Sequence, residues 1–464
     1  MAAITATNVP DPSNVGGLQA TPQNYTSLAT LLDPTKPDVR DLYVKTYGDQ
    51  GITGFLELTG AKKNAGTSDN VQWYEEGRLH KTVVYTALVP AVADTSNAAI
   101  TCDNTLARVN DVLLLATGQR VVITGLVSTT GFEVMTMDGS VLTTASDAGV
   151  AAIIGNVYGQ GTEQPTAFYE AGLTLRTNPY IITKEMYEVN GSQATNIGWL
   201  NVNGQYMWYL KNEMDTRKRF MNQREMMLLY SQLGPAASPA LVDLGGIAGD
   251  DTATNVAGNV GSEGYFSAVE KRGITTAGAF GGGTGAGYTP ISDIDTIILS
   301  LDKEGAPSEY AMYVNRQTSL DVDDMLASGL GTTSGGLTSQ FGAFNNSQDM
   351  AVSLGFKSFT RGGYTFHKHD WKLLNDATLG GLGNHYKGAM IPMSQVADAK
   401  SGIKSPSLEM NYKSAGNYSR EMEHWVEGGG VLGHVTSGKD SVKFNYRSEC
   451  NLVTRAANQH VVIK

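Results

Sequence analysis

The stretch QYMWYLKNEMDTRKRFMNQREMMLLYSQL, Gln205 to Leu233, runs for 29 residues without a glycine or a proline. A turn-forming pair, Asn203-Gly204, stands before it, and Gly234-Pro235 follows it. Such residues are the usual start and stop signals of a helix. At 1.5 Å per residue the helix would extend roughly 40 Å, well beyond the ~11 residues of an average helix. The remaining sequence reads as short strands and glycine-rich loops, so this long helix has no helical partner of similar length.

Apolar residues recur at three- and four-residue steps along this helix, and Arg217 and Arg224 interrupt their stripe. The five apolar residues are Met207, Leu210, Met214, Met221 and Leu228. A core helix in a bundle is the ordinary explanation of such a stripe, but a bundle needs partner helices. We therefore expect the five to pack on a sheet of their own chain, with the charged side free to meet another subunit. The two arginines would then need carboxylate partners, because an unpaired buried charge costs several kcal/mol.

Composition indicates a large ordered protein with many turns. The 464 residues suffice for roughly two to four domains, and 54 glycines predict many tight turns. A net charge of -11, with no basic run longer than Arg217–Arg219, argues against a general nucleic-acid binder. Cys102 and Cys450 are too few for a disulfide framework or a zinc cluster, and we expect Cys450 to be a buried small hydrophobe. We expect neither a signal peptide nor a membrane span, and synthesis in a cytoplasm.

The first half of the chain divides into an arm, two strand regions and a module between them. Residues 1–50 are polar and dotted with prolines, so we expect their own body or another subunit to hold them. The pattern favours strands over Val71–Val89 and Phe168–Arg176. Between them, about Pro90 to Pro165, short strands alternate with turn-rich residues, which is typical of a small barrel or sandwich.

The second half mixes helices, strands and glycine-rich loops. Ile291–Asp302 reads as a helix with Ser292 and Asp293 as caps, and Asp321–Leu326 as a short helix. Glu309–Val314 reads as a buried strand. Asp440–Arg455 is an amphipathic strand of period two. Its apolar side comprises Val442, Phe444, Tyr446, Cys450 and Leu452.

No motif specifies a chemical reaction. Gly281–Gly287 lacks the GxGxxG spacing of a nucleotide loop, and Gly433–Asp440 matches GxxxxGK but supplies Asp440 where a magnesium-binding hydroxyl is needed. His367 and His369 lie on one side of a predicted strand, as a metal pair requires, but no third ligand can be identified. A metal-dependent enzyme that uses these two histidines stays an alternative. We expect no cofactor, no metal site and no catalytic residue.

Three segments and the order of the parts carry a family resemblance. The segments are GFLELTG (Gly54–Gly60), SDNVQWYEEGRLH (Ser68–His80) and the C-terminal run from Ile391-Pro392 through Pro406-Ser407-Leu408 and Tyr418–Glu421 to Asp440–Asn458. The chain resembles the Hong Kong 97-type major capsid proteins of tailed bacteriophages (Caudoviricetes), and looks most like those of crAss-like phages of gut Bacteroidales. The resemblance implies an α+β fold. Its parts would be an N-terminal arm (1–50), an extended β loop and start of the peripheral domain (51–89 and 166–190), an inserted small all-β domain (90–165), a peripheral domain with the spine helix (191–240), a mainly axial domain (241–395) and C-terminal strands of both domains (396–464).

The resemblance also implies a function without catalysis. Such a protein would assemble with itself as pentamers and hexamers into an icosahedral shell around double-stranded DNA, without sequence-specific binding. Portal, scaffold, cement or head-fibre proteins would be its partners, the virion capsid its location and the cytoplasm of the bacterial host its place of synthesis. An encapsulin, a nanocompartment that encloses a cargo enzyme, is the nearest alternative. Candidate subunit contacts combine aromatic anchors with charges. They are Trp73, Tyr74, Glu75, Glu76, Arg78, Arg217 and Arg224.

Overall fold

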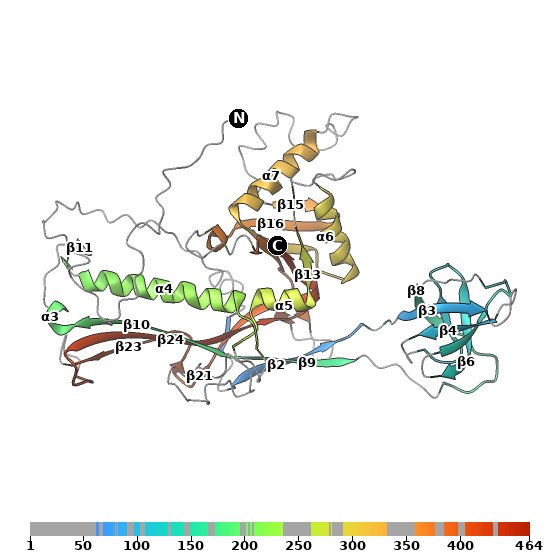
Figure 1. Cartoon of the computed structure of the whole chain (residues 1–464), viewed down its shortest axis with the longest axis horizontal. Coiled ribbons are helices and arrows are strands. Elements are labelled where there is room, and N and C mark those ends of the chain that lie inside the picture. The colour runs from blue at the N-terminus through green and yellow to red at the C-terminus, as the bar shows by residue number, and fades with distance from the viewer. Residues whose placement is uncertain are drawn as a thin grey trace. The chain divides into compact units, whose positions relative to one another are not determined.

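A computed structural model of the chain divides into two compact units (Figure 1). The first, called the body here, comprises Met1–Gln72 and Thr177–Lys464, and the second, called the excursion, comprises Trp73–Arg176. The structure describes residues 62–64, 68–78, 80, 82–90, 97–102, 107–128, 131–142, 149–165, 172–194, 201–202, 205–206, 208–234, 261–277, 280, 291–331, 358–375, 385–397, 404–429 and 435–464. The predicted arm (1–50) and the glycine-rich run Gly281–Gly287 lie outside these residues.

One sheet of the body is built around the long strand β24 (Ser441–Thr454). Strand β10 (Ile181–Asn190) pairs antiparallel along one edge of β24. Strands β23 (Glu423–Gly428) and β20 (Leu408–Tyr412) pair antiparallel along the other, and β1 (Lys62–Asn64) runs parallel to β20. The predicted strand over Asp440–Arg455 is confirmed, and all five apolar residues named for its inner side are buried. Its amphipathic alternation holds only as far as Arg447, because Glu449 and Asn451 on the other side are buried too.

Helix α4 (Trp208–Tyr230) lies along this sheet (Figure 1). The predicted helix is confirmed, but it is three residues shorter at each end. Gln205–Tyr206 form a short strand, β12, which pairs with β11 (Asn201–Val202). Phe220 of α4 packs in a cluster with Tyr187 and Val189 of β10 and Val442, Phe444 and Tyr446 of β24.

The second sheet of the body has six strands and mixed directions. Its order is β13 (Ile274–Thr276), β25 (Val461–Ile463), β17 (Gly388–Pro392), β14 (Glu309–Val314), β16 (Tyr364–Asp370) and β15 (Ser358–Arg361). Helices α6 (Ser292–Lys303) and α7 (Arg316–Gly331) pack against it through one buried cluster. The predicted strand Glu309–Val314 is confirmed at both ends.

Two expectations about the helices of this region are wrong. Ser292 and Asp293 do not cap α6, because its N-cap residue is Ile291 and no side chain caps it. Helix α7 is longer than the predicted Asp321–Leu326. It begins earlier because the Asn315 side-chain oxygen accepts a hydrogen bond from the Thr318 backbone N–H at 2.7 Å, which is the geometry of an N-cap.

The two sheets of the body share a core at the end of α4. Leu228 and Leu229 of α4, Phe266 of α5 (Tyr265–Arg272), Trp371 and Cys450 of β24 belong to one buried cluster. Cys450 is therefore the buried small hydrophobe that its strand position predicted. Shorter elements of the body complete the list. They are α3 (Gly191–Ala194), η2 (Lys372–Asn375), η5 (Ala457–Gln459), β18 (Gln395–Ala397) with β19 (Lys404–Pro406), and β21 (Ser414–Ala415) with β22 (Tyr418–Ser419).

A fully hydrogen-bonded asparagine ties β9 (Leu173–Pro179) to this region. The Asn178 amide nitrogen donates to the backbone carbonyls of Glu263 and Leu452 at 3.0 and 2.7 Å. Its side-chain oxygen accepts from the Ser262 hydroxyl at 3.0 Å and the Glu263 backbone N–H at 2.8 Å. Because all four bonding positions are used, this buried side chain holds three distant segments in register.

The excursion contains a closed six-stranded β-barrel, one of the two architectures predicted for this region. Its strands close in the order β3-β4-β7-β6-β5-β8. They are β3 (Thr82–Pro90), β4 (Asn97–Cys102), β5 (Asp111–Leu114), β6 (Arg120–Ser128), β7 (Gly131–Thr136) and β8 (Gly149–Asn156). Inward residues such as Val83, Tyr85 and Phe132 fill the barrel, so it has its own core. Strand β2 (Asn70–Glu76) pairs with β9 in a separate two-stranded sheet.

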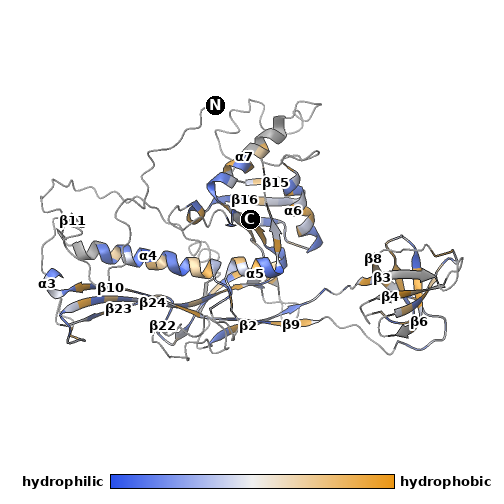
Figure 2. Cartoon of the chain, viewed as in Figure 1, coloured by the Kyte–Doolittle hydropathy of each residue, from blue (hydrophilic) through white to orange (hydrophobic). Residues whose placement is uncertain are grey.

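Local composition along α4 is mixed. Figure 2 shows hydrophilic and hydrophobic residues alternating along the helix, so its sequence marks no single continuous apolar face. Among the helices of the described residues, none is both long and apolar enough to cross a membrane.

Candidate subunit-contact surfaces

One face of the β2–β9 ribbon satisfies its polar groups internally. The Trp73 indole N–H donates to a Glu75 carboxylate oxygen at 3.1 Å, and the Arg176 guanidinium donates to the other oxygen at 3.0 Å. Trp73 and Glu75, two of the predicted subunit contacts, thus bond to each other within the chain, and Arg176 is the partner that the sequence did not reveal. The sequence offers one indication of Arg176, because this residue ends the strand predicted over Phe168–Arg176. A partly exposed pair of this kind stabilises the ribbon by only about 0–1 kcal/mol.

The opposite face of the ribbon is exposed and carries three apolar side chains beside the polar Gln72 and Glu76. Side chains alternate along a strand, so Tyr74 of β2 and Leu173 and Leu175 of β9 point away from the Trp73–Glu75–Arg176 face. Tyr74 is 68% exposed and Leu173 is 66% exposed. Glu76 and Arg78 are exposed as well. An isolated two-stranded ribbon is marginally stable in water, and a cluster of exposed apolar side chains usually marks an interaction surface.

Helix α4 presents a different face to the sheet than its apolar stripe predicts. Leu228 is buried, but Met214 is 54% exposed and Met221 is also exposed, so the prediction that these two methionines pack on the chain's own sheet is wrong. The side chains of Met207 and Leu210 lie outside the described residues. The buried line instead follows four-residue steps through Thr216, Phe220, Arg224 and Leu228. Because this buried line includes a threonine and an arginine, the hydrophobicity of the side chains alone predicts the wrong buried face of α4.

The two arginines of the stripe have different surroundings. Arg224 is buried and donates its Nη1 hydrogen to the backbone carbonyl of Glu421 at 3.3 Å. It is therefore inside the chain, and its prediction as a surface contact is wrong. Arg217 is exposed on α4. It stays a candidate for contact with another subunit.

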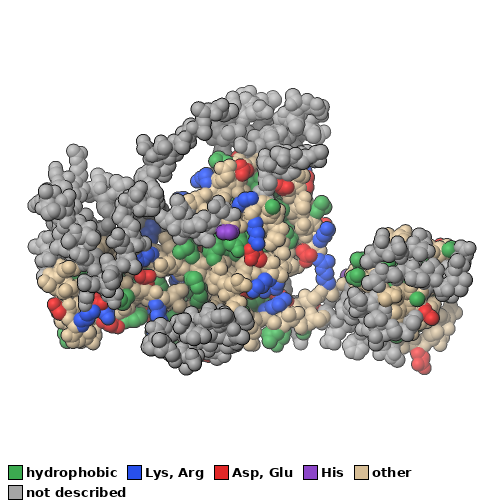
Figure 3. All heavy atoms as spheres, viewed as in Figure 1, with side chains coloured by type: hydrophobic (Ala, Val, Ile, Leu, Met, Phe, Trp, Pro, Cys, Tyr) green, Lys and Arg blue, Asp and Glu red, His purple; other side chains and the backbone are tan. Residues whose placement is uncertain are grey.

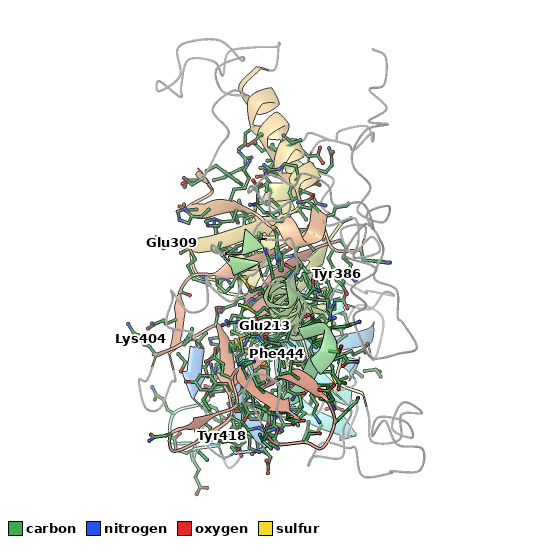
Figure 4. The ribbon with its side chains drawn as sticks, turned by 90° about the vertical axis from the view of Figure 1, so that its left-hand side faces the viewer. Glu213, Glu309, Tyr386, Lys404, Tyr418 and Phe444 are labelled. Atoms are coloured by element: carbon green, nitrogen blue, oxygen red, sulfur yellow. The ribbon has the colours of Figure 1, made fainter. Side chains whose placement is uncertain are left out.

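Polar contacts on the helix also hold it to the sheet. The Tyr446 hydroxyl of β24 donates to the Glu213 carboxylate, and the Arg219 guanidinium contacts Glu185 of β10 at 2.8 Å. Burial, followed by the Glu213 carboxylate, raises the pKa of the Tyr446 hydroxyl. Figure 4 views α4 end-on above the sheet and labels Glu213 of the helix and Phe444 of β24. Part of the charged side of α4, predicted to meet another subunit, is therefore engaged within the chain.

His367 and His369 lie on β16, within the six-stranded sheet. The His369 ring stacks on Tyr313 with centroids 5.1 Å apart, and burial, followed by His367, lowers the pKa of His369. In the part of the chain that the structure describes, no group of three or more His, Cys, Asp or Glu residues could hold a metal ion. His367 is half-buried and His369 is exposed at the end of the strand.

Charges on the face shown in Figure 3 are mixed. Lys and Arg side chains of the described residues are interspersed there with Asp and Glu. Among the coloured residues of that face, no continuous basic surface follows the path that a nucleic-acid backbone would need.

The chain is similar to solved structures from phages. One is from Gordonia phage Cozz, with 9% identity over 96% of this chain and 97% of that chain and a TM-score of 0.42. Another is the mature capsid of bacteriophage PhiM1, with 7% identity over 98% of both chains and a TM-score of 0.39. The holo-SrpI encapsulin complex from Synechococcus elongatus PCC 7942 is more distant, with 12% identity over 63% of this chain and 77% of that chain and a TM-score of 0.33. No family model and no curated protein matches the chain.

Proposed function

We propose that this chain is a Hong Kong 97-type major capsid protein, which assembles with itself as pentamers and hexamers into an icosahedral shell around double-stranded DNA. On the segments quoted above, we further propose that capsid proteins of crAss-like phages are its nearest relatives. Its function is assembly, and no step requires a cofactor. Portal, scaffold, cement or head-fibre proteins would join the same virion, and the bacterial host's cytoplasm would be the place of synthesis.

The exposed apolar face of the β2–β9 ribbon carries this proposal. Tyr74, Leu173 and Leu175 lie uncovered on a two-stranded element that has little stability of its own. Covering these side chains with a neighbouring subunit would stabilise both the ribbon and the contact. Many copies of a modest contact add up in a closed shell, since each subunit presents the same surfaces to its neighbours.

The outward face of α4 supplies a second contact region in this proposal. Met214 and Met221 are exposed beside the exposed Arg217. Methionine adapts its shape to irregular partner surfaces, which suits copies that occupy slightly different positions in a shell. We assign the sheet under α4 to a peripheral domain, the six-stranded sheet to an axial domain and the barrel to an insertion in the extended loop.

The direct test is the mass and shape of the assembly formed by the full chain. Sedimentation and electron microscopy should reveal closed particles of many subunits. A stable monomer or small oligomer under every condition of salt, pH and concentration would refute the proposal.

A pair of matched variants tests the ribbon face. Leu173→Asp should abolish particles or lower their yield at least about tenfold, because each contact would bury an unpaired carboxylate. Leu299→Asp is the control, since Leu299 on α6 is 63% exposed against 66% for Leu173. Both variants should keep the far-UV circular dichroism of the parent. Equal yields from the two variants would exclude the ribbon face as a contact.

An encapsulin shell is the alternative that uses the same contacts. The contents of native particles distinguish the two functions. Packaged double-stranded DNA is the result expected of a capsid, whereas a protein cargo without DNA would assign the chain to the encapsulins.

A further inference from the structure

The polar side of β24 is buried beyond Arg447, where Glu449 and Asn451 are covered. On the neighbouring strand β20, Glu409 and Asn411 are buried as well, and Asn411 is the direct partner of Asn451 across the two strands. The side chains of directly paired residues project from the same face of a sheet. This end of the sheet therefore has a polar face in the interior of the body.

Tyr180 adds a third group to this face. It directly precedes β10, whose first residue, Ile181, pairs with Cys450 of β24. Because the two strands are antiparallel, Tyr180 stands beside Asn451, the next residue of β24. Burial, followed by the Glu449 carboxylate, raises the pKa of Tyr180 to about 12. The influence of Glu449 agrees with a position of the phenol on the polar face.

Three polar atoms of this face have no hydrogen-bond partner in the described part of the chain. They are the Tyr180 hydroxyl, Asn411 Nδ2 and Asn451 Oδ1, on side chains of residues that are 4%, 3% and 0% exposed. The amide of Asn451 has a fixed orientation, since its Nδ2 donates to the Asn178 backbone carbonyl at 2.9 Å. A buried polar atom without a partner lowers stability, and folded proteins contain few of them.

The charged side chains of the same face are paired with one another. Glu409 binds Arg455 through both carboxylate oxygens, at 2.9 and 3.4 Å. The Arg420 guanidinium contacts one oxygen of Glu449, and Lys413 Nζ lies 3.7 Å from the other. These ion pairs make the surroundings of the three atoms polar. A polar site of this kind retains water, whereas an apolar cavity stays dry.

The hydrogen-bonding character of the three atoms selects the ligand. Asn411 presents an N–H donor, Asn451 presents a carbonyl acceptor, and the Tyr180 hydroxyl can donate or accept. A cation would face the hydrogens of the Asn411 amide, and an anion would face the Asn451 oxygen and the Glu449 carboxylate. The ligand must therefore be neutral and able both to donate and to accept.

We infer that one ordered water molecule is bound between Tyr180, Asn411 and Asn451. It accepts a hydrogen bond from Asn411 Nδ2, donates one to Asn451 Oδ1 and bonds to the Tyr180 hydroxyl. Buried waters typically make about three such bonds to groups that lack a partner in the protein. The water joins the side chains of three neighbouring segments, and through Asn451 it extends the network of Asn178, which ties β9 to the body. The site lies within one chain, so it does not depend on assembly.

A density map of the full chain that shows ordered water elsewhere in the core tests the site directly. One peak should lie about 2.7–3.2 Å from each of the three atoms. A direct hydrogen bond between Asn411 and Asn451, or a site without density, would refute the inference.

Removing the Tyr180 hydroxyl gives opposite results for a hydrated and a dry site. Tyr180→Phe should lower the equilibrium constant of folding about fivefold, which corresponds to about 1 kcal/mol, because a hydrogen bond to the water is lost. At a dry site the same change would raise the constant, since it deletes a hydroxyl that has no partner. The measurement is urea unfolding, with hydrogen exchange of the β24 amides to assign the change to the body.

Tyr230→Phe is the matched control. The Tyr230 hydroxyl is also buried without a partner among the described residues, but its ring packs on the rings of Phe266 and Tyr386. This variant should leave the folding constant unchanged or raise it. An equal rise in Tyr180→Phe would show that the Tyr180 site is dry and would overturn the inference.

A double variant tests whether the groups share one water. Asn411→Leu should also lower the folding constant about fivefold. Tyr180→Phe combined with Asn411→Leu should lower it by less than the product of the two single factors, because both changes release the same molecule. Factors that multiply would refute the shared water. If Asn411→Leu does not fold, the direction of the change in Tyr180→Phe still decides.

Discussion

Replacing Phe220 by alanine tests which face of α4 rests on the sheet. Phe220 is 1% exposed, and its ring lies 5.8 Å from the ring of Tyr446. Deleting a buried phenylalanine side chain costs about 3–5 kcal/mol, because the cavity it leaves adds to the lost burial. Met214→Ala is the matched change on the opposite face. Met214 is 54% exposed, so its truncation should cost no more than about 1 kcal/mol, and the higher helix propensity of alanine offsets part of that loss.

The assay is urea unfolding of unassembled subunits, followed by far-UV circular dichroism and by hydrogen exchange of the α4 and β24 amides. The free energy of unfolding should fall at least about 2 kcal/mol further for Phe220→Ala than for Met214→Ala. Hydrogen exchange localises the loss, since the amides of α4 and β24 should lose protection while those of the barrel keep it. A Met214→Ala variant that loses as much stability as Phe220→Ala would refute this orientation. The apolar stripe would then be the buried face after all.

Two further predictions concern buried polar groups. Asn178→Leu should destabilise the body by several kcal/mol in urea unfolding. The change leaves two backbone carbonyls and one backbone N–H without their hydrogen-bond partner, at a cost of about 1–3 kcal/mol each. Asn156→Leu is the control, because Asn156 is exposed at the end of β8 and its replacement should change the unfolding midpoint little. Burial lowers the pKa of His460 from 6.5 to about 3, so below about pH 6.5 the unfolded chain binds a proton that the folded chain excludes. Stability should therefore fall with acidification by up to about 1.4 kcal/mol per pH unit, and His460→Gln should flatten the dependence between about pH 6.5 and 5. An unchanged slope in His460→Gln would assign the effect to other groups.

Local patterns predicted the elements whose apolar residues face one core. The strands over Asp440–Arg455 and Glu309–Val314 are predicted correctly, because alternation with period two and short apolar runs are typical of buried strands. The barrel was one of two architectures expected, because its short strands and turns alternate regularly. The long helix was read correctly as a helix for a simpler reason: no glycine or proline interrupts it.

Features that depend on distant partners were misread. Residue type alone predicts Ser292 as a cap of α6, but the N-cap position is occupied by Ile291. Arg224 was expected on the surface, yet the segment before β23 folds over it and accepts its hydrogen bond. Of the candidate subunit contacts, Trp73 and Glu75 bond to each other within the ribbon, and their partner Arg176 comes from about a hundred residues later in the chain.

The sequence by itself determined that Gln205–Leu233 contains a long helix, that strands surround it and that no catalytic motif accompanies it. Only the tertiary structure decided which way the helix faces. The buried face of a helix is the one whose side chains fit the space and the hydrogen-bonding groups of the neighbouring elements. Phe220 and Arg224 are therefore buried, while Met214 and Met221 face outward. Hydrophobicity ranks single side chains, whereas burial is decided by the shape and polar groups of the surface that receives them. Met214 and Met221, which the apolar stripe assigns to a core, therefore lie on the exposed side of the helix, where we propose that a second subunit contacts them.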